Sequence, residues 1–213
     1  LEHLAMASRG PIQVIAWLAL LIALASALAG KSLEQGVQVV LDQRDDLPEA
    51  RRKLGWIVGR DTADLDRSAI LRALAETASE NGVDGLFAPL FWMLVGAGLW
   101  AINPAWLGPL SLAWAFKAAS TLDSMLGYRR GKLAWLGTAG ARLDDLLVWL
   151  PCRLVAVSLP LAGGQPGRSI GVLAAARRDG AADPSPNAGL SQAAYAHVAG
   201  VQLGGSNSYG GQV

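Results

Sequence analysis

Charged residues on one predicted helix face are the clearest candidates for chemistry in this chain. Arg72, Glu76 and Glu80 are spaced four apart, and a helix places residues at this spacing on one face. Two such glutamates are tolerated if they are solvated, and they are useful if their carboxylate oxygens hold Mg²⁺. Asn81 and Asp84 follow directly. The spacing leaves open a solvated charged face and a magnesium site made by Glu76, Glu80 and Asp84.

A second candidate is the cluster Arg60-Asp61-Thr62, which ends a short apolar run beginning at Trp56. The planar guanidinium of Arg60 is suited to bidentate binding of a phosphate or a carboxylate. Arg60 and Asp61 could instead cap the helix that follows. Both interpretations stay open at this point.

A third ionic group consists of Arg142, Asp144 and Asp145, directly before the apolar run that starts at Leu146. Charged side chains next to lipid-facing segments are costly in free energy. Their presence therefore favours a functional role over a purely structural one.

Two common kinds of site are disfavoured. Ala25–Ser32 satisfies a loose phosphate-binding-loop pattern, but the residues before Gly30 end an apolar helix and supply no glycine amides. A helix end, with Lys31 reaching toward water, is the better interpretation. One cysteine, Cys152, cannot form an internal disulfide, and with only two histidines a zinc site is disfavoured. Cys152 lies in an apolar run and is predicted to be a small core residue.

The composition favours a membrane protein. Hydrophobic residues make up 52% of the chain and charged residues 16%, whereas soluble domains carry about 25% charged residues. A net charge of +1, without a basic face bearing aromatic residues, disfavours nucleic-acid binding. We therefore expect an all-α, polytopic integral membrane protein with charged helical loops at the interface or in the cytoplasm.

The apolar runs divide this single membrane domain, residues 1–213. A helix needs about 20 apolar residues to cross a bilayer, and residues 12–29 are long enough; a signal peptide is disfavoured because no clear cleavage site follows. Asn103-Pro104 predicts a turn between two further apolar runs. The predicted parts are a transmembrane helix at 12–29, a cytoplasmic helical region at 31–85, a membrane hairpin at 86–116, a catalytic loop region at 117–145, an apolar segment at 146–162 and a Gly/Pro-rich C-terminal region at 163–213.

Finer features follow from periodicity and charge. Asp64–Asn81 has helical periodicity, with Asp64 as the expected N-cap, and helices are also predicted at Ser169–Arg178 and around Ser191–Ala199. Pro151 and Arg153 predict a kinked or partly inserted apolar segment. Basic loops favour the cytoplasm, so both ends of the hairpin are expected there. The basic residues after it are Lys117, Arg129, Arg130 and Lys132.

Taken together, these pieces resemble the CobD/CbiB-type cobalamin-biosynthesis family, that of adenosylcobinamide-phosphate synthase. No single piece is decisive, but their order and number make the resemblance specific from Lys31 onward. The matching stretches are Lys53–Thr62, Arg72–Leu90, Phe116–Tyr128, Ala141–Asp145, Pro151–Leu154, Ser185–Asn187 and Leu203–Gly205 with Asn207 and Tyr209.

The resemblance implies an enzyme of the inner membrane with a cytoplasmic active face. It would join (R)-1-amino-2-propanol or its O-phosphate to adenosylcobyric acid through an amide, using ATP and Mg²⁺. Carboxylates are the usual anchors for Mg²⁺, and basic groups would neutralise phosphate charge. The implied catalytic residues are Glu76, Glu80, Asp84, Asp123, Asp144 and Asp145. The implied cofactor-binding residues are Arg60, Asp61, Thr62, Lys117, Arg142, Ser185 and Asn187.

Some features depart from the family pattern. Ser120 stands where the family has Asn, and Asp183-Pro184 precede Ser185 where the family has a His-Ser or Asn-Pro pair. Each keeps a polar or turn-forming residue, so activity is expected to remain. Family members extend further at both ends, so we expect a fragment. The competing function is a non-catalytic sensory or regulatory relative, or a transporter component; a transporter should carry its ionisable residues inside the spans.

Overall fold

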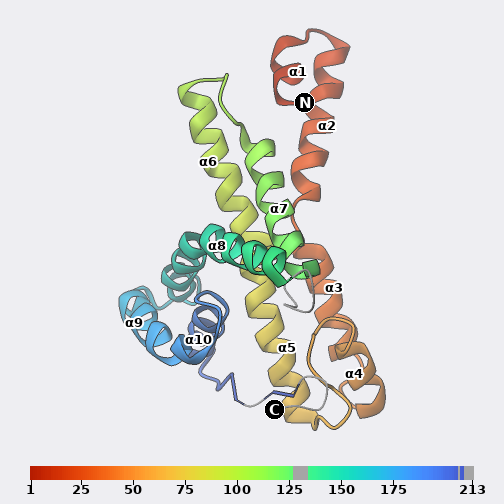
Figure 1. Ribbon diagram of the computed structural model, residues 1–213, viewed down its shortest axis with the longest axis vertical. Helices are drawn as coiled ribbons and strands as arrows, with labels where there is room; N and C mark the ends of the chain where they lie inside the picture. Colours follow the sequence, from red (N-terminus) through yellow and green to blue (C-terminus); the bar gives the residue numbers. More distant parts are fainter. Residues whose placement is uncertain (127–133, 206, 209–213) are drawn as a thin grey trace. The chain divides into compact units, whose positions relative to one another are not determined.

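The computed structural model describes residues 1–126, 134–205, 207 and 208 (Figure 1). Residues Gly127, Tyr128, Arg129, Arg130, Lys132 and Tyr209, which entered the sequence analysis, lie outside this part. Within it the chain forms helices and no strands, which confirms the all-α prediction. The helices of at least eight residues are α2 (Pro11–Ser26), α3 (Gly30–Leu41), α4 (Leu47–Leu54), α5 (Arg67–Gly82), α6 (Ala88–Ile102), α7 (Pro109–Leu126), α8 (Ala134–Ala162), α9 (Ser169–Asp179) and α10 (Ala188–Ala199).

In the part of the chain that the structure describes, two helical stretches are long and apolar enough to cross a membrane, Arg67–Ile102 and Trp135–Ala162. The first joins α5 and α6 through the π-helical turn η1 (Val83–Phe87). A third span results if α2 and α3, bent by 41° at their junction, count as one. The run predicted at 12–29 therefore forms only the 16-residue α2 as a continuous helix, which is short for a bilayer by itself.

The chain divides into two compact units. Unit 1 contains Leu1–Ala29 and Asp84–Pro151, and unit 2 contains Gly30–Val83 and Cys152–Val213.

In unit 1, α6 and α7 pack along each other on either side of the predicted turn at Asn103. The Asn103 side chain accepts a hydrogen bond from the Ala105 amide, and the Trp106 amide donates to the Asn103 carbonyl. The short helix α1 (Glu2–Ala7) supplies the buried Glu2, whose carboxylate accepts from the Leu110 amide in the first turn of α7. The two arms of the predicted hairpin are thus helices, with α7 starting at Pro109.

A small residue allows the start of α7 to approach α6 closely. A Cβ at Gly96 would lie 2.6 Å from the carbonyl carbon and oxygen of Gly108. We expect Gly96→Ala to separate this end of the hairpin and lower the melting temperature of the detergent-solubilised full-length protein by several degrees, since backbone atoms cannot yield as a side chain does. Gly98→Ala is the matched control, because nothing lies within 4 Å of a Cβ there. Equal melting temperatures for the two variants would contradict this packing.

The prediction of a loop at 117–145 is wrong for the described residues, 117–126 and 134–145, which are helical. The helix α7 continues to Leu126, and α8 begins at Ala134 and runs through Pro151 to Ala162. Residues 117–126 contain neither Gly nor Pro and include strong helix formers such as Ala and Leu, so their polar residues do not end the helix. The apolar segment predicted at 146–162 is the second half of α8.

Unit 2 contains a small core formed by α3, α4 and α5. Val40, Leu54, Ile70 and Leu74 are among its buried residues. The helix α5 begins with Asp66 as its N-cap, whose carboxylate accepts from the Ala69 amide at 2.7 Å. The N-cap predicted at Asp64 is therefore wrong by two residues, because Asp66 has the extended backbone that an N-cap needs.

The C-terminal part of unit 2 is a packed pair of helices. The helices α9 and α10 occupy Ser169–Asp179 and Ala188–Ala199, close to the two ranges predicted from the sequence. The short 3₁₀ turn η4 (Gly180–Ala182) connects α9 to the loop before α10. Gly180 and Gly189 bring the backbones of η4 and α10 together, because a Cβ on either would overlap the other backbone.

Candidate functional site

The centre of the candidate site is a buried ion pair in unit 2. Glu76, on the inward face of α5, has a side chain only 1% exposed, and Arg60 one 11% exposed. Nη1 of Arg60 lies 2.6 Å from Oε2 of Glu76. A buried pair of this kind persists only when further hydrogen bonds satisfy both groups.

The chain segment after α10 supplies these further bonds. The Gly204 amide donates to Oε1 of Glu76 at 2.6 Å, and Nη1 of Arg60 donates to Oδ1 of Asn207 at 2.8 Å. The Asp61 amide donates to the Ser208 carbonyl at 2.9 Å. Two motifs far apart in the sequence, Arg60-Asp61 and Leu203-Gly204-Gly205, therefore meet at one carboxylate.

Arg72 lies beside the same carboxylate. Its Nε is 3.9 Å from Oε1 of Glu76, too long for a hydrogen bond. This Nε is buried without a hydrogen-bond partner in the part of the chain that the structure describes. The predicted alignment of Arg72 and Glu76 on one helix face is confirmed.

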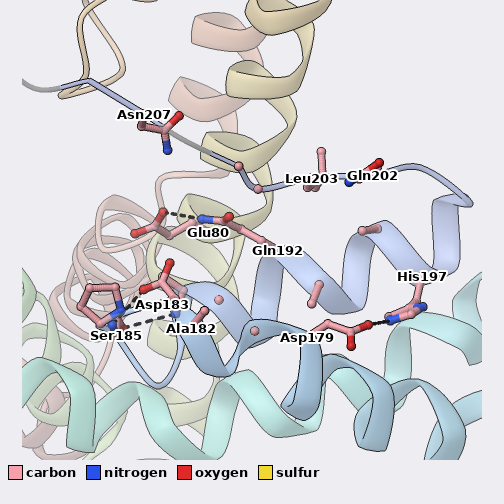
Figure 2. Close-up of a pocket in the computed structure, with 18 of the residues that line it drawn as sticks. Glu80, Asp179, Ala182, Asp183, Ser185, Gln192, His197, Gln202, Leu203 and Asn207 are labelled. Carbon is pink, nitrogen blue, oxygen red and sulfur yellow. Dashed lines mark hydrogen bonds and ion pairs between the residues drawn. The ribbon is translucent and has the colours of Figure 1, made fainter. Parts of the chain in front are cut away.

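A cavity of about 940 Å³ opens next to this ion pair (Figure 2). Small-molecule sites typically measure about 300–1,000 Å³, so this one has room for a ligand of nucleotide size. Glu80, Asp183 and Gln192 point into it. The Gln192 amide reaches Oε2 of Glu80 at 3.5 Å. The other polar residues that line the cavity are mainly Arg60, Asp179, Ser185, His197, Gln202 and Asn207.

The loop before α10 forms one side of this cavity. The carboxylate of Asp183 accepts from the Ser185 amide at 2.8 Å, and the Ser185 hydroxyl accepts from the Asn187 and Ala188 amides at 3.3 Å. The Asn187 side chain also accepts from Nη1 of Arg153 at 2.8 Å. Ser185 and Asn187, which are predicted to bind a cofactor, thus form hydrogen bonds that stabilise the start of α10.

His197 and Asp179 lie at the opposite side of the cavity. The ring Nε2 of His197 is 2.8 Å from Oδ2 of Asp179, and both residues are drawn in Figure 2. Hydrogen bonds from His197 and then Arg178 lower the pKa of the Asp179 carboxyl, which favours its ionised form.

The comparisons with known proteins identify the family. The model of a family described as "CobD/Cbib protein" matches residues 2–213. The chain belongs to the CobD/Cbib family. Three residues meet at the buried ion pair of unit 2: Arg60, Glu76 and Gly204. All three lie in the sequence stretches that resemble the CobD/Cbib family.

Named relatives agree with this assignment. The chain is 48% identical over 200 residues to "Cobalamin biosynthesis protein CobD" of Synechocystis, covering 93% of this chain and 56% of that protein. It is 43% identical over 192 residues to the protein of the same name from Pelobacter propionicus, covering 87% and 55%. It is 42% identical over 191 residues to "Cobalamin biosynthesis protein CbiB" of Salmonella typhi, covering 88% and 56%. The chain spans about half the length of these curated relatives, and no solved structure matches it.

Not all candidate residues of this CobD/Cbib chain belong to the unit with the cavity. Asp84 lies in η1, Lys117 and Asp123 in α7, and Arg142, Asp144 and Asp145 in α8, all within unit 1. A Cβ at Gly140 of α8 would lie 3.5 Å from the backbone nitrogen of Asp123, so the end of α7 packs against the start of α8. The catalytic roles predicted for these residues stay predictions.

The magnesium site also stays a prediction. Among the described residues, no group of three or more His, Cys, Asp or Glu side chains is arranged to hold a metal ion. Glu76 is bound on both oxygens by Arg60 and the Gly204 amide. Mg²⁺ bound with a nucleotide needs only one or two carboxylates, because phosphates and waters supply its other ligands. Glu80 and Asp183 are the carboxylates on the cavity that fit this requirement.

Sequence reasoning missed Asp179, Asp183, Gln192 and His197 as lining residues. From the sequence, Asp183 stands out only as a departure from the family pattern, and His197 only as one of two histidines, too few to favour a zinc site. The turn signal in Asp183-Pro184-Ser185-Pro186, just before a predicted helix, could have pointed to an ordered loop at a helix start. For the others no signal in the sequence was available.

Proposed function

We propose that the full-length protein joins (R)-1-amino-2-propanol, or its O-phosphate, to adenosylcobyric acid through an amide bond, with ATP supplying the energy. The observation that carries the proposal is the family match over residues 2–213 together with the motif-lined cavity. The relatives' names assign them to cobalamin biosynthesis, and the ligation is the step that the family resemblance implies.

The chemistry requires activation of a carboxylate. A free carboxylate does not react with an amine in water, so ATP must first convert it to an acyl phosphate or an adenylate. The amine nitrogen then attacks the carbonyl carbon, and the C–O bond to phosphate or AMP breaks. The amine gives up a proton in the process. A site for this reaction must hold phosphate, carboxylate and ammonium groups together.

The cavity residues fit such a site. Glu80 and Asp183 offer carboxylate oxygens for Mg²⁺ bound to nucleotide phosphates, or for a protonated amine. Mg²⁺ would supply charge neutralisation at the phosphates. Arg60 lies at the edge of the cavity, but its Nη1 is already shared between Glu76 and Asn207. We therefore propose that Arg60 mainly holds the cavity wall in place and does not mainly bind the ligand. The protein is proposed to work in the inner membrane, with this cavity on the cytoplasmic side.

The test is a growth experiment with two corrinoids. A bacterium that lacks this gene, and any related one, is expected not to make cobalamin from cobyric acid but to make it from cobinamide, which already carries the arm. Supplying the full-length gene should restore use of cobyric acid. A sensor or a transporter would change gene expression or uptake and would not separate the two corrinoids in this way. Growth of the deletion strain on cobyric acid would contradict the proposal.

A further inference from the structure

The contacts of Glu76 differ from those expected of a residue that touches a ligand. Oε1 accepts from the Gly204 amide and Oε2 from Arg60, both at 2.6 Å. The side chain is 1% exposed. Glu76 does not line the cavity, whereas Glu80, one turn further along α5, does. The two glutamates of one helix face therefore have different tasks.

The partner of Glu76 is a segment without regular secondary structure. We define the C-terminal segment as residues 201–205 with 207 and 208; none of them is in a helix. Gly204 and Gly205 have φ of 88° and 111°, a backbone conformation that other residues adopt only with strain. These glycines allow the segment to turn so that the Gly204 amide points at Glu76.

The C-terminal segment is one wall of the cavity. Val201, Gln202, Leu203, Gly204, Gly205 and Asn207 all line it. In Figure 2 the chain at Gln202 and Leu203 passes on the side of Glu80 that is away from Asp183. The hydrogen bonds that hold this wall to α5 and to the Arg60-Asp61 motif are those to Glu76, to Asn207 and to the Ser208 carbonyl. Loss of the Glu76 carboxylate would weaken the bond to the Gly204 amide and remove the charge partner that holds Arg60 next to Asn207, and we therefore expect it to loosen the wall.

We propose that Glu76 is a positioning residue, which fixes Arg60 and the C-terminal segment as one wall of the cavity and thereby sets the affinity for the bound substrate. It does not take part in the chemical step. This inference rests on the proposed function for the identity of the substrate. The contacts that carry it, however, are within the protein and do not depend on any ligand.

The first arm of the test measures hydrogen exchange in the full-length protein without substrate. In Glu76→Gln, peptides that cover residues 201–208 should exchange about 10-fold faster or more, because the protecting contacts open more often. Glu80→Gln is the matched control, with the same chemical change one helical turn away at a carboxylate that accepts its hydrogen bond from Gln192; its peptides should exchange as in the wild type. Unchanged exchange in Glu76→Gln would overturn the inference.

Glu76→Gln leaves the buried Arg60 without its charge partner, and such a change can prevent folding. Asn207→Ala is therefore the second variant. It removes the side chain that accepts from Arg60, and it lies in the segment itself, away from the helix packing. Faster exchange over residues 201–208 in a folded Asn207→Ala protein would support the inference, and exchange as in the wild type would contradict it.

The second arm measures steady-state kinetics for ATP, cobyric acid and the amine. For a positioning residue, KM for at least one substrate should rise about 10-fold in Glu76→Gln and in Asn207→Ala, while kcat stays within about threefold. A fall in kcat of about 100-fold with unchanged KM would show a role in the chemical step and would overturn the inference. If the wild-type protein makes no amide at all, the proposed function fails, and the exchange measurements alone then decide the role of Glu76.

Discussion

In the full-length protein, Glu80→Gln is expected to lower kcat for amide formation by about 100-fold or more, which corresponds to about 2.7 kcal/mol of transition-state stabilisation. Glu80 points into the cavity beside Asp183. Glutamine keeps the size and a hydrogen-bonding carbonyl but removes the negative charge. A cation at this position, whether Mg²⁺ on a nucleotide or the ammonium group of the amine, would lose its main electrostatic partner.

The dependence on Mg²⁺ identifies which cation Glu80 binds. If Glu80 serves Mg²⁺, the variant should need a higher Mg²⁺ concentration for half-maximal rate; if it serves the amine, KM for the amine should rise instead. Glu34→Gln is the control, because Glu34 is an exposed residue of α3 whose carboxylate forms an ion pair with Lys31. Glu34→Gln should behave as the wild type. If the Glu80→Gln enzyme has the wild-type rate and the wild-type dependence on ATP and Mg²⁺, Glu80 is only a solvated charge with no role in the reaction.

Glu76 and Glu80 show what a sequence can and cannot predict about a site. The spacing of Arg72, Glu76 and Glu80 correctly predicts one helix face, since that is a local property of the helix. The partners of Glu76 are Gly204 and, through Arg60, Asn207, which lie 128 and 147 residues from the groups they bind. No periodicity encodes such a contact. The division of work between Glu76 and Glu80 therefore becomes visible only in three dimensions.

The helices also show that local sequence signals are predictive. The Gly- and Pro-rich turns that bound the short helices α9 and α10 are local signals, and the sequence predicts both helices to within a few residues. The stretch from Lys117 to Asp145 was predicted as a loop because charged and polar residues interrupt its apolar pattern. Polar residues do not by themselves end a helix that also contains strong helix formers such as Ala and Leu. The helix α7 has neither Gly nor Pro after its first residue, and α8 continues through Gly137, Gly140 and Pro151.

A close backbone contact in unit 2, between Gly180 and Gly189, likewise cannot be read from the sequence. Gly180 ends α9, and Gly189 lies in the first turn of α10. Both residues line the cavity. A glycine at a helix end is common for conformational reasons alone. Here, however, Gly180 has a φ of −83°, which other residues adopt without strain, so its small size is the property that matters.

Gly180→Ala is expected to destabilise unit 2 by about 2–3 kcal/mol or more, as overpacking against a fixed neighbour does. The new Cβ would overlap the carbonyl group of Gly189 and lie 2.7 Å from the Leu190 nitrogen. These are backbone atoms of α10 and cannot rotate away, so η4 and α10 must separate. Since both form part of the cavity wall, substrate binding should weaken together with stability.

The measurement is thermal unfolding of the detergent-solubilised full-length protein, with a fall in Tm of several degrees expected. Gly171→Ala provides the matched control, because Gly171 lies in the neighbouring helix α9 with nothing within 4 Å of a Cβ. Alanine favours a helix over glycine by up to about 1 kcal/mol, so the control should melt at the wild-type temperature or above it. If Gly180→Ala melts no lower than Gly171→Ala, the close approach of η4 to α10 is not present in the protein.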